Sequence, residues 1–145
     1  MSPDDARALQ SVLRTLLRSG RRSVPAITGV SRAASRLLGA IARRGDDEVR
    51  PGELADDLGM TSSNVATTLR ELEGAGYIER RRAVTDARQI LIRLTDRGGE
   101  AVAEHRTLKV DALREAIGAS LTEAEQAQLV AVVPLLQRVA AGHRQ

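Results

Sequence analysis

The sequence predicts a mainly α-helical protein with one small β-hairpin, an α+β fold in which helices dominate. Apolar residues recur at helical spacing over most of the chain, and strand-like alternation replaces this period only between residues 77 and 94. The composition, 42% hydrophobic against 28% charged over 145 residues, is that of one folded domain rather than of a disordered chain.

Two helices open the chain. Ser2 can cap the first helix with Pro3 at its first position, and the helix is expected to end near Gly20. A polar link over residues 21–29 precedes a second helix, which Gly45 closes. The apolar positions are Leu9, Val12, Leu13, Leu16 and Leu17 in the first helix, and Ala34, Leu37, Leu38 and Ile41 in the second.

Two shorter helices follow, joined by a tight turn. After a loop at residues 46–50, Pro51 suits the first position of a helix that Gly59 ends. Thr61 or Ser62 can cap the next helix, because a side-chain hydroxyl there accepts from a free N–H group. The buried stripe of this second helix is expected at Val65, Leu69 and Leu72, and its end at Gly74 to Gly76.

A β-hairpin is predicted next. Two short runs with strand character, residues 77–82 and 89–94, frame a tip at residues 83–88. Residues in the second run alternate, so that Ile90, Ile92 and Leu94 are expected to face inward, and Leu91 and Arg93 outward. A further short extended piece is expected at Val49.

Two helices close the chain. Thr95 can cap a long helix that runs to Gly118, and Thr122 with Glu125 forms a capping box for the last helix. Pro134 lies inside the last helix and should kink it or leave one carbonyl unpaired. The apolar positions are Val102, Leu108, Ala112, Leu113, Ala116 and Ile117, then Leu129, Val132, Val133, Leu136 and Val139.

The order helix, Gly-containing turn, helix and hairpin is that of a winged helix-turn-helix. Such a unit needs a small residue where its helices meet, which Ala55 supplies, and a glycine in the turn, which Gly59 supplies. The same pattern also allows an ordinary αα-hairpin in a helical bundle. We expect a single domain, 1–145, with the winged module at 49–95, N-terminal helices at 1–45 and C-terminal helices at 96–145.

The second helix of the helix-turn-helix carries a face suited to DNA. If the apolar stripe faces the core, Ser63, Thr67 and Arg70 lie on the opposite side, flanked by Asn64 and Glu71. Hydroxyls, an amide and a guanidinium suit base edges in a major groove, and free N–H groups at the helix start suit a phosphate. The predicted DNA-binding residues of this helix are Thr61, Ser62, Ser63, Asn64, Thr67, Thr68 and Arg70.

Positive charge gathers on the predicted hairpin. The formal net charge is +3, yet residues 80–97 hold six arginines against two aspartates, and residues 1–44 carry nine arginines against two aspartates. Because Arg80, Arg81 and Arg82 alternate in direction, we expect only one or two of them to face one DNA backbone, together with Arg88. The arginines of residues 1–44 either reach phosphates or pair with acidic C-terminal residues across a dimer.

Several motifs resemble the MarR family of bacterial transcription regulators. They are Gly76-Tyr77-Ile78-Glu79-Arg80, Asp86-Ala87-Arg88 and Leu94-Thr95-Asp96-Arg97-Gly98, and the helix order matches over essentially the whole chain. The resemblance implies that Arg88 enters the minor groove and that Asp86 orients its guanidinium; a local bridge within the turn is the alternative. With the charge pattern, it makes Arg80, Arg82, Asp86 and Arg88 the predicted DNA-binding residues of the hairpin.

The terminal helices predict a homodimer. Their apolar faces exceed what the winged module can cover, and two-fold symmetry then predicts an inverted-repeat operator with half-sites about 34–36 Å apart. The resemblance implies that these helices dimerise and that a small lipophilic or aromatic effector binds between the dimerisation and DNA-binding regions and releases the DNA. A ligand-responsive repressor is therefore expected, with an aliphatic, Arg-bordered pocket because aromatic residues are scarce.

Other functions are disfavoured. The absence of cysteine excludes thiol redox chemistry, and base-stacking platforms are not expected because Tyr77 is the only ring among Phe, Trp and Tyr. The only histidines are His105 and His143, and neighbours in a helix such as Glu104 and His105 point about 100° apart, so no enzyme, cofactor or metal site is expected. Without a secretory signal or a run of roughly 20 apolar residues, a cytoplasmic location is expected. The remaining alternative is a winged-helix module for protein interaction or for non-specific DNA binding without an effector.

Overall fold

The computed structural model describes residues 1–45, 48–84, 86 and 88–142. The predicted loop residues 46 and 47, residues 85 and 87 of the hairpin tip, and His143 lie outside the described residues. Six helices and one two-stranded antiparallel hairpin are present among those that are described, which confirms the mainly α-helical fold. The chain divides into two compact units, Arg21–Leu108 and Met1–Gly20 with Lys109–Gln145.

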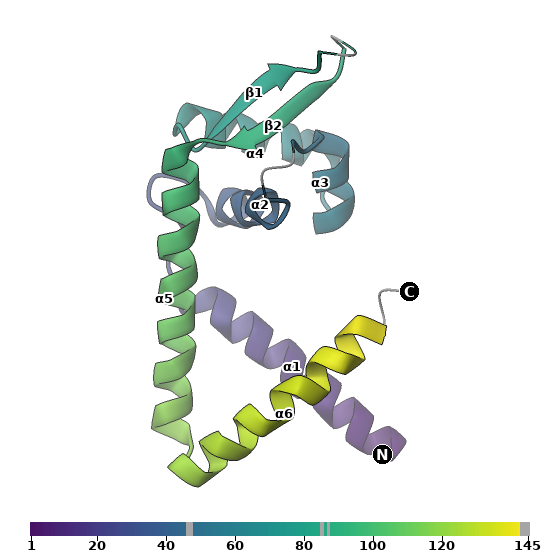
Figure 1. The fold of residues 1–145 in the computed structure, drawn as a ribbon, viewed down its shortest axis with the longest axis vertical. Coiled ribbons are helices and arrows are strands. Elements are labelled where there is room, and N and C mark those ends of the chain that lie inside the picture. The colour runs from purple at the N-terminus through teal and green to yellow at the C-terminus, as the bar shows by residue number, and fades with distance from the viewer. Residues whose placement is uncertain (46–47, 85, 87, 143–145) are drawn as a thin grey trace. The chain divides into compact units, whose positions relative to one another are not determined.

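The unit Arg21–Leu108 contains the helix-turn-helix and the hairpin. Its elements are α2 (Arg32–Arg43), α3 (Pro51–Leu58), α4 (Ser62–Gly74), β1 (Ile78–Arg82), β2 (Ile90–Leu94) and the first part of α5 (Asp96–Ser120). Figure 1 shows α2, α3 and α4 grouped beside one end of the hairpin. They share one core, whose fully buried side chains include Leu37, Leu38, Ile41, Val49, Leu54, Val65, Leu69, Leu72 and Ile92. Because α2 supplies three of these, it is packed as part of the same unit as the winged module.

The turn between α3 and α4 has the geometry that the sequence predicts. Gly59 adopts a left-handed conformation (φ 60°, ψ 35°), which a residue without a Cβ adopts at low cost. The N–H of Met60 donates to the carbonyl of Ala55 at 3.0 Å, and Thr61 Oγ1 accepts from the N–H of Asn64 at 3.2 Å. The turn thus ends one helix and caps the next within three residues.

The hairpin pairs β1 with β2 in a register that places Ile78 opposite Leu94 and Arg82 opposite Ile90. Val49 joins this sheet through an isolated bridge to Ile92, with N–H to carbonyl distances of 3.0 and 2.9 Å, as the predicted extended piece requires. Ile92 is buried, but Ile90 is 43% exposed, so Ile90 is not part of the core although alternation places it on the inward face. Ile90 shares a face with Ile92, but it lies nearer the tip of the hairpin and is not among the buried residues of the core.

A set of short contacts anchors the start of α5 to the base of the hairpin. Thr95 Oγ1 donates to the carbonyl of Gly76 at 2.7 Å and accepts from the N–H of Gly98 at 3.0 Å, which confirms Thr95 as the helix cap. The N–H of Thr95 donates to the carbonyl of Tyr77 at 3.1 Å. Residues 94–98, one of the motifs that carry the family resemblance, therefore serve the architecture of the wing.

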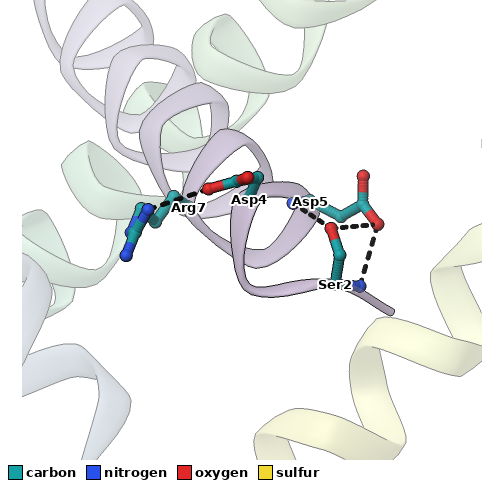
Figure 2. Close-up of polar contacts among 4 residues, drawn as sticks. All are labelled: Ser2, Asp4, Asp5 and Arg7. Atoms are coloured by element: carbon teal, nitrogen blue, oxygen red, sulfur yellow. Dashed lines mark hydrogen bonds and ion pairs between the residues drawn. The ribbon is translucent and has the colours of Figure 1, made fainter.

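The second unit contains α1 (Pro3–Arg22), the rest of α5 and α6 (Glu123–Gly142). Figure 2 shows the cap of α1: Ser2 Oγ accepts from the N–H of Asp5 at 3.1 Å, while Ser2 N and Oγ donate to Asp5 Oδ2 at 2.9 and 2.8 Å. These bonds favour the ionised carboxylate and lower the pKa of Asp5. Arg7 forms an ion pair with Asp4 at 2.8 Å in the same turn.

Helix ends depart from the predictions by a turn or less. Helix α1 extends to Arg22 rather than ending near Gly20, and α5 continues past Gly118 to Ser120. The Thr122–Glu125 capping box forms as predicted, and α6 runs on through Pro134. No helix among the described residues is both long enough and apolar enough to cross a membrane.

Helices α1 and α6 present apolar side chains to solvent. Within the described part of the chain, neither helix has a buried residue. The exposed large apolar residues of α1, the second half of α5 and α6 are Leu9, Val12, Leu13, Leu16, Val110, Leu113, Leu129, Val130, Val132, Val133, Leu135 and Val139. Leaving so much apolar surface in water is unfavourable, and such surfaces mark interaction sites.

Candidate nucleic-acid interface

Helix α4 presents an exposed face on which most side chains are polar. Ser63, Asn64, Thr67 and Arg70 are all exposed, opposite the buried stripe of Val65, Leu69 and Leu72. Arg70 Nη2 donates to Thr67 Oγ1 at 3.1 Å, which holds the guanidinium along the helix surface. The predicted residues Thr61 and Ser62, at the start of the helix, are exposed as well. The structure therefore brings these six predicted residues onto one accessible surface.

Thr68 is not part of that surface, which corrects its placement among the DNA-binding residues. Its side chain is buried, with 6% exposed, and its hydroxyl donates to the carbonyl of Asn64 at 2.8 Å. At 100° per residue Thr68 lies 60° from Val65, on the edge of the buried stripe. The helical period of the sequence is therefore enough to predict that Thr68 is buried.

Glu71 of α4 has a structural contact that the sequence did not reveal. Its carboxylate accepts from the backbone N–H of Ser31 and, at 2.9 Å, from the Ser31 hydroxyl. Ser31 is the N-cap of α2, where a negative charge is favourable. Glu71 thus ties α4 to α2.

Three of the six arginines in residues 80–97 are paired with acidic residues. Arg80 Nε lies 3.0 Å from Glu73 Oε2, Arg93 Nε lies 3.2 Å from Glu79 Oε1, and Arg81 pairs with Glu48. Arg97 lies instead over the ring of Tyr77, with its Cζ 5.0 Å from the ring centroid. The hairpin is therefore less positive than its local sequence indicates.

Arg82 and Arg88 are the two exposed arginines of the hairpin for which the described residues provide no acidic partner. Arg82 shares a strand face with Arg80, and Arg81 lies on the other face, so the three arginines alternate as predicted. Arg88 is the last residue of the tip. These two side chains carry the positive charge that the hairpin can offer a ligand.

Asp86 contacts the backbone of Arg88 rather than its guanidinium. Asp86 Oδ1 accepts from the N–H of Arg88 at 3.0 Å, and the Asp86 carbonyl accepts from the N–H of Gln89 at 2.9 Å. This is a local turn bridge, the alternative that the sequence left open. In this structure Asp86 shapes the turn, and the Arg88 side chain is exposed.

A pocket of about 260 Å³ lies within the unit Arg21–Leu108. Its walls are residues 25–28, Tyr77 and one face of α5 from Arg97 to Leu108. The Tyr77 hydroxyl donates to the carbonyl of Thr28 at 2.7 Å, and His105 Nε2 lies 3.0 Å from the carbonyl of Pro25. The pocket is bordered by Arg97 and adjoins the base of the hairpin. No group of three or more potential metal ligands occurs among the described residues.

Comparison with known proteins identifies the family. A family model described as MarR family matches residues 28–89. The HTH-type transcriptional regulator YdgJ of Bacillus subtilis (strain 168) is 31% identical over 108 residues, which are 74% of this chain and 64% of YdgJ. The chain thus spans somewhat less than two thirds of that relative.

Solved structures share the fold over nearly the full chain. A crystal structure described as a transcriptional regulator protein from Pseudomonas aeruginosa PA01 is 37% identical, covers 94% of both chains and has a TM-score of 0.81. A mutant of MepR from S. aureus, bound to an oligodeoxyribonucleotide, is 19% identical with a TM-score of 0.66 and covers 93% of this chain and 96% of that one. The match to the family model and the similarity over nearly the full chain agree with the winged helix-turn-helix, and the chain belongs to the MarR family, whose members are transcriptional regulators and not enzymes.

Proposed function

We propose that this protein is a cytoplasmic transcription regulator that binds double-stranded DNA specifically. The observation that carries the proposal is the exposed polar face of α4 beside a hairpin with two arginines, Arg82 and Arg88, that lack an acidic partner among the described residues. A helix with this face fits a major groove, and arginines on a hairpin fit the adjacent minor groove. The MepR structure with the same fold and a bound oligodeoxyribonucleotide supports this use.

The proposed contacts fall into two groups. Ser63, Asn64, Thr67 and Arg70 would contact base edges, and Thr61 and Ser62 would place the start of α4 against a phosphate. Arg82 and Arg88 would contact the backbone and minor groove, with Asp86 holding the turn that presents Arg88. Thr68 is left out because it is buried.

The proposed assembly is a homodimer on an inverted-repeat operator. The exposed apolar side chains of α1, α5 and α6 need a partner, and a second copy supplies one with the matching surface. Two recognition helices related by a two-fold axis would then read half-sites about 34–36 Å apart. Such a complex would repress transcription by blocking access of the polymerase to the DNA it covers.

The pocket beside Tyr77 is the proposed place for a small lipophilic or aromatic effector. Arg97 borders it, but Tyr77 and the polar residues Glu100, Glu104 and His105 also line it, so its wall is less aliphatic than the sequence predicts. It also lies within the unit Arg21–Leu108 rather than between two regions. A compound bound there would press on the segment that joins α4, the hairpin and α5, and so change how the DNA-binding residues are presented. A compound library in which no member weakens DNA binding would overturn this part of the proposal.

The test of the function is selection of bound duplexes from a random pool, with excess unrelated duplex as competitor. We expect recovery of an inverted repeat, and binding that survives the competitor. Purely electrostatic binding would instead decrease with both competitor and salt. Recovery of featureless duplexes would favour the alternative of a non-specific or protein-binding winged helix.

A further inference from the structure

The ion pair between Glu73 and Arg80 joins the recognition helix to the hairpin. Glu73 lies in the last turn of α4, and Arg80 is the middle residue of β1. Their atoms Oε2 and Nε are 3.0 Å apart. Only the short connection of residues 75–77 separates the two elements along the chain, so this side-chain contact adds a second link between them.

Arg80 is poorly placed for a phosphate. Only 25% of its side chain is exposed, and its Nε and Nη2 atoms are buried. Nε contacts Glu73 as an ion pair without the geometry of a hydrogen bond, and Nη2 has no hydrogen-bond partner among the described residues. Across the hairpin it faces Ile92, which is fully buried. A guanidinium in such a place depends on its one carboxylate, because removing either partner leaves a covered charge uncompensated.

The ion pair that lies within the hairpin, between Glu79 and Arg93, lacks these properties. Glu79 and Arg93 are direct cross-strand partners, with 55% and 54% of their side chains exposed. Their contact stays within the hairpin and joins it to no helix. Glu79 therefore provides a matched control for Glu73, since both are carboxylates paired with an arginine of the same hairpin.

The Glu73–Arg80 pair lies near the base of the hairpin, so a small change in angle there moves the hairpin tip by a larger distance. A strand rises about 3.3 Å per residue, so the tip lies about 13 Å beyond Arg80. A tilt of about 15° at the base would move the tip by about 3 Å, which is as long as a hydrogen bond. The angle at which β1 leaves α4 therefore decides whether Arg82 and Arg88 reach the DNA that α4 reads.

We propose that Glu73 and Arg80 are positioning residues that set the angle between the recognition helix and the hairpin, and that Arg80 is not a phosphate contact. This inference rests on the proposed DNA binding. The acidic residue Glu73 then favours the binding of DNA, which is itself an anion. Electrostatic repulsion alone would predict the opposite effect.

The sign of the effect provides the test. Replacement of either carboxylate removes one negative charge, and electrostatics alone would strengthen DNA binding in both variants. We expect the control Glu79→Gln to bind the selected duplex as tightly as wild type or up to about threefold more tightly. Glu73→Gln should bind about tenfold more weakly, although it removes the same charge.

A double-mutant cycle with Arg88→Ala tests whether Glu73 affects DNA binding through the position of the hairpin tip. If Glu73 acts by placing the tip, Arg88→Ala should cost much less affinity in the Glu73→Gln background than in wild type, while its effect in the Glu79→Gln background stays unchanged. Urea unfolding of each variant checks that the fold is retained, since Glu73→Gln keeps the size of a side chain that is 44% exposed but leaves Arg80 without its carboxylate.

The possible outcomes separate this inference from the proposed function. A wild-type protein that binds no duplex overturns the DNA-binding function, and the positioning role with it. If wild type binds but Glu73→Gln behaves like Glu79→Gln, only the positioning role is overturned. Additive effects of Glu73→Gln and Arg88→Ala would also overturn it, because the pair would then act elsewhere than on the tip.

Discussion

Gly98 shows how one residue can fix the junction between the hairpin and α5. A Cβ at this position would overlap the carbonyl oxygen of Tyr77 and lie 2.9 Å from its carbonyl carbon. The obstacle is backbone, which cannot rotate away as a flexible side chain could. The glycine therefore lets the first turn of α5 lie directly against the strand connection that Thr95 also anchors.

Gly98→Ala should destabilise the protein by about 2–4 kcal/mol, since the clash forces the backbone to move. The neighbouring Gly99→Ala is the matched control, because a Cβ there meets nothing within 4 Å. That change should stabilise the helix by up to about 1 kcal/mol. Urea unfolding measures both values, and equal stabilities for the two variants would contradict the close packing at Tyr77.

Single residues were predictable where their role depends on near neighbours. The caps at Ser2, Thr61 and Thr95 follow from side-chain hydroxyls before a helical period, and all three form. The placement of Thr68 on the DNA-binding surface is wrong because its angle on the helix puts it at the edge of the buried stripe. The exposure of Ile90 was missed for another reason, since strand alternation gives the face of a residue but not how far the core extends.

At the scale of elements, the ion pairs of the hairpin could not be predicted from the local charge count. Glu48 and Glu73 come from outside residues 80–97 and reach Arg81 and Arg80 only when the loop before α3 and the end of α4 pack beside β1. Such partners depend on tertiary structure. The apparent surplus of charge on the hairpin is thereby reduced to Arg82 and Arg88.

The capping box of α6 gives that helix end a dependence on pH. The backbone N–H and the hydroxyl of Thr122 donate to Glu125 Oε2 at 2.8 and 2.9 Å, and these bonds lower the pKa of Glu125 from its ordinary value of 4.5. Because the folded-state pKa is below the unfolded value, the stabilisation is complete above pH 4.5 and is lost as the pH falls through the lowered pKa.

The stability difference between wild type and Glu125→Gln should therefore be constant near neutral pH and shrink below about pH 4.5. Urea unfolding at pH values from about 7 to about 3 measures it. The variant Glu123→Gln is the control, since it removes a charge from the same turn outside the capping box. A difference for Glu125→Gln that does not change with pH would show that the carboxylate bonds are not retained in solution.

At the scale of the whole molecule, the terminal helices distinguish this chain from an isolated winged helix. Their apolar side chains repeat along α1, the second half of α5 and α6, and the single chain leaves them exposed. From the helical spacing of these apolar residues, the sequence predicts a surface that the winged module alone cannot cover. The sequence does not identify the partner, because the spacing of apolar residues is the same whether the interface forms with a second copy or with another protein.

The most direct measurement is a hydroxyl-radical footprint on the selected duplex, with wild type, Arg88→Ala and, as a control, Arg7→Ala, which removes the same charge from α1. We expect two protected segments related by two-fold symmetry and about 34–36 Å apart, flanked by minor-groove protection that Arg88→Ala alone removes. A single protected segment would contradict the dimer, and identical footprints for wild type and Arg88→Ala would contradict the role of the hairpin in binding DNA.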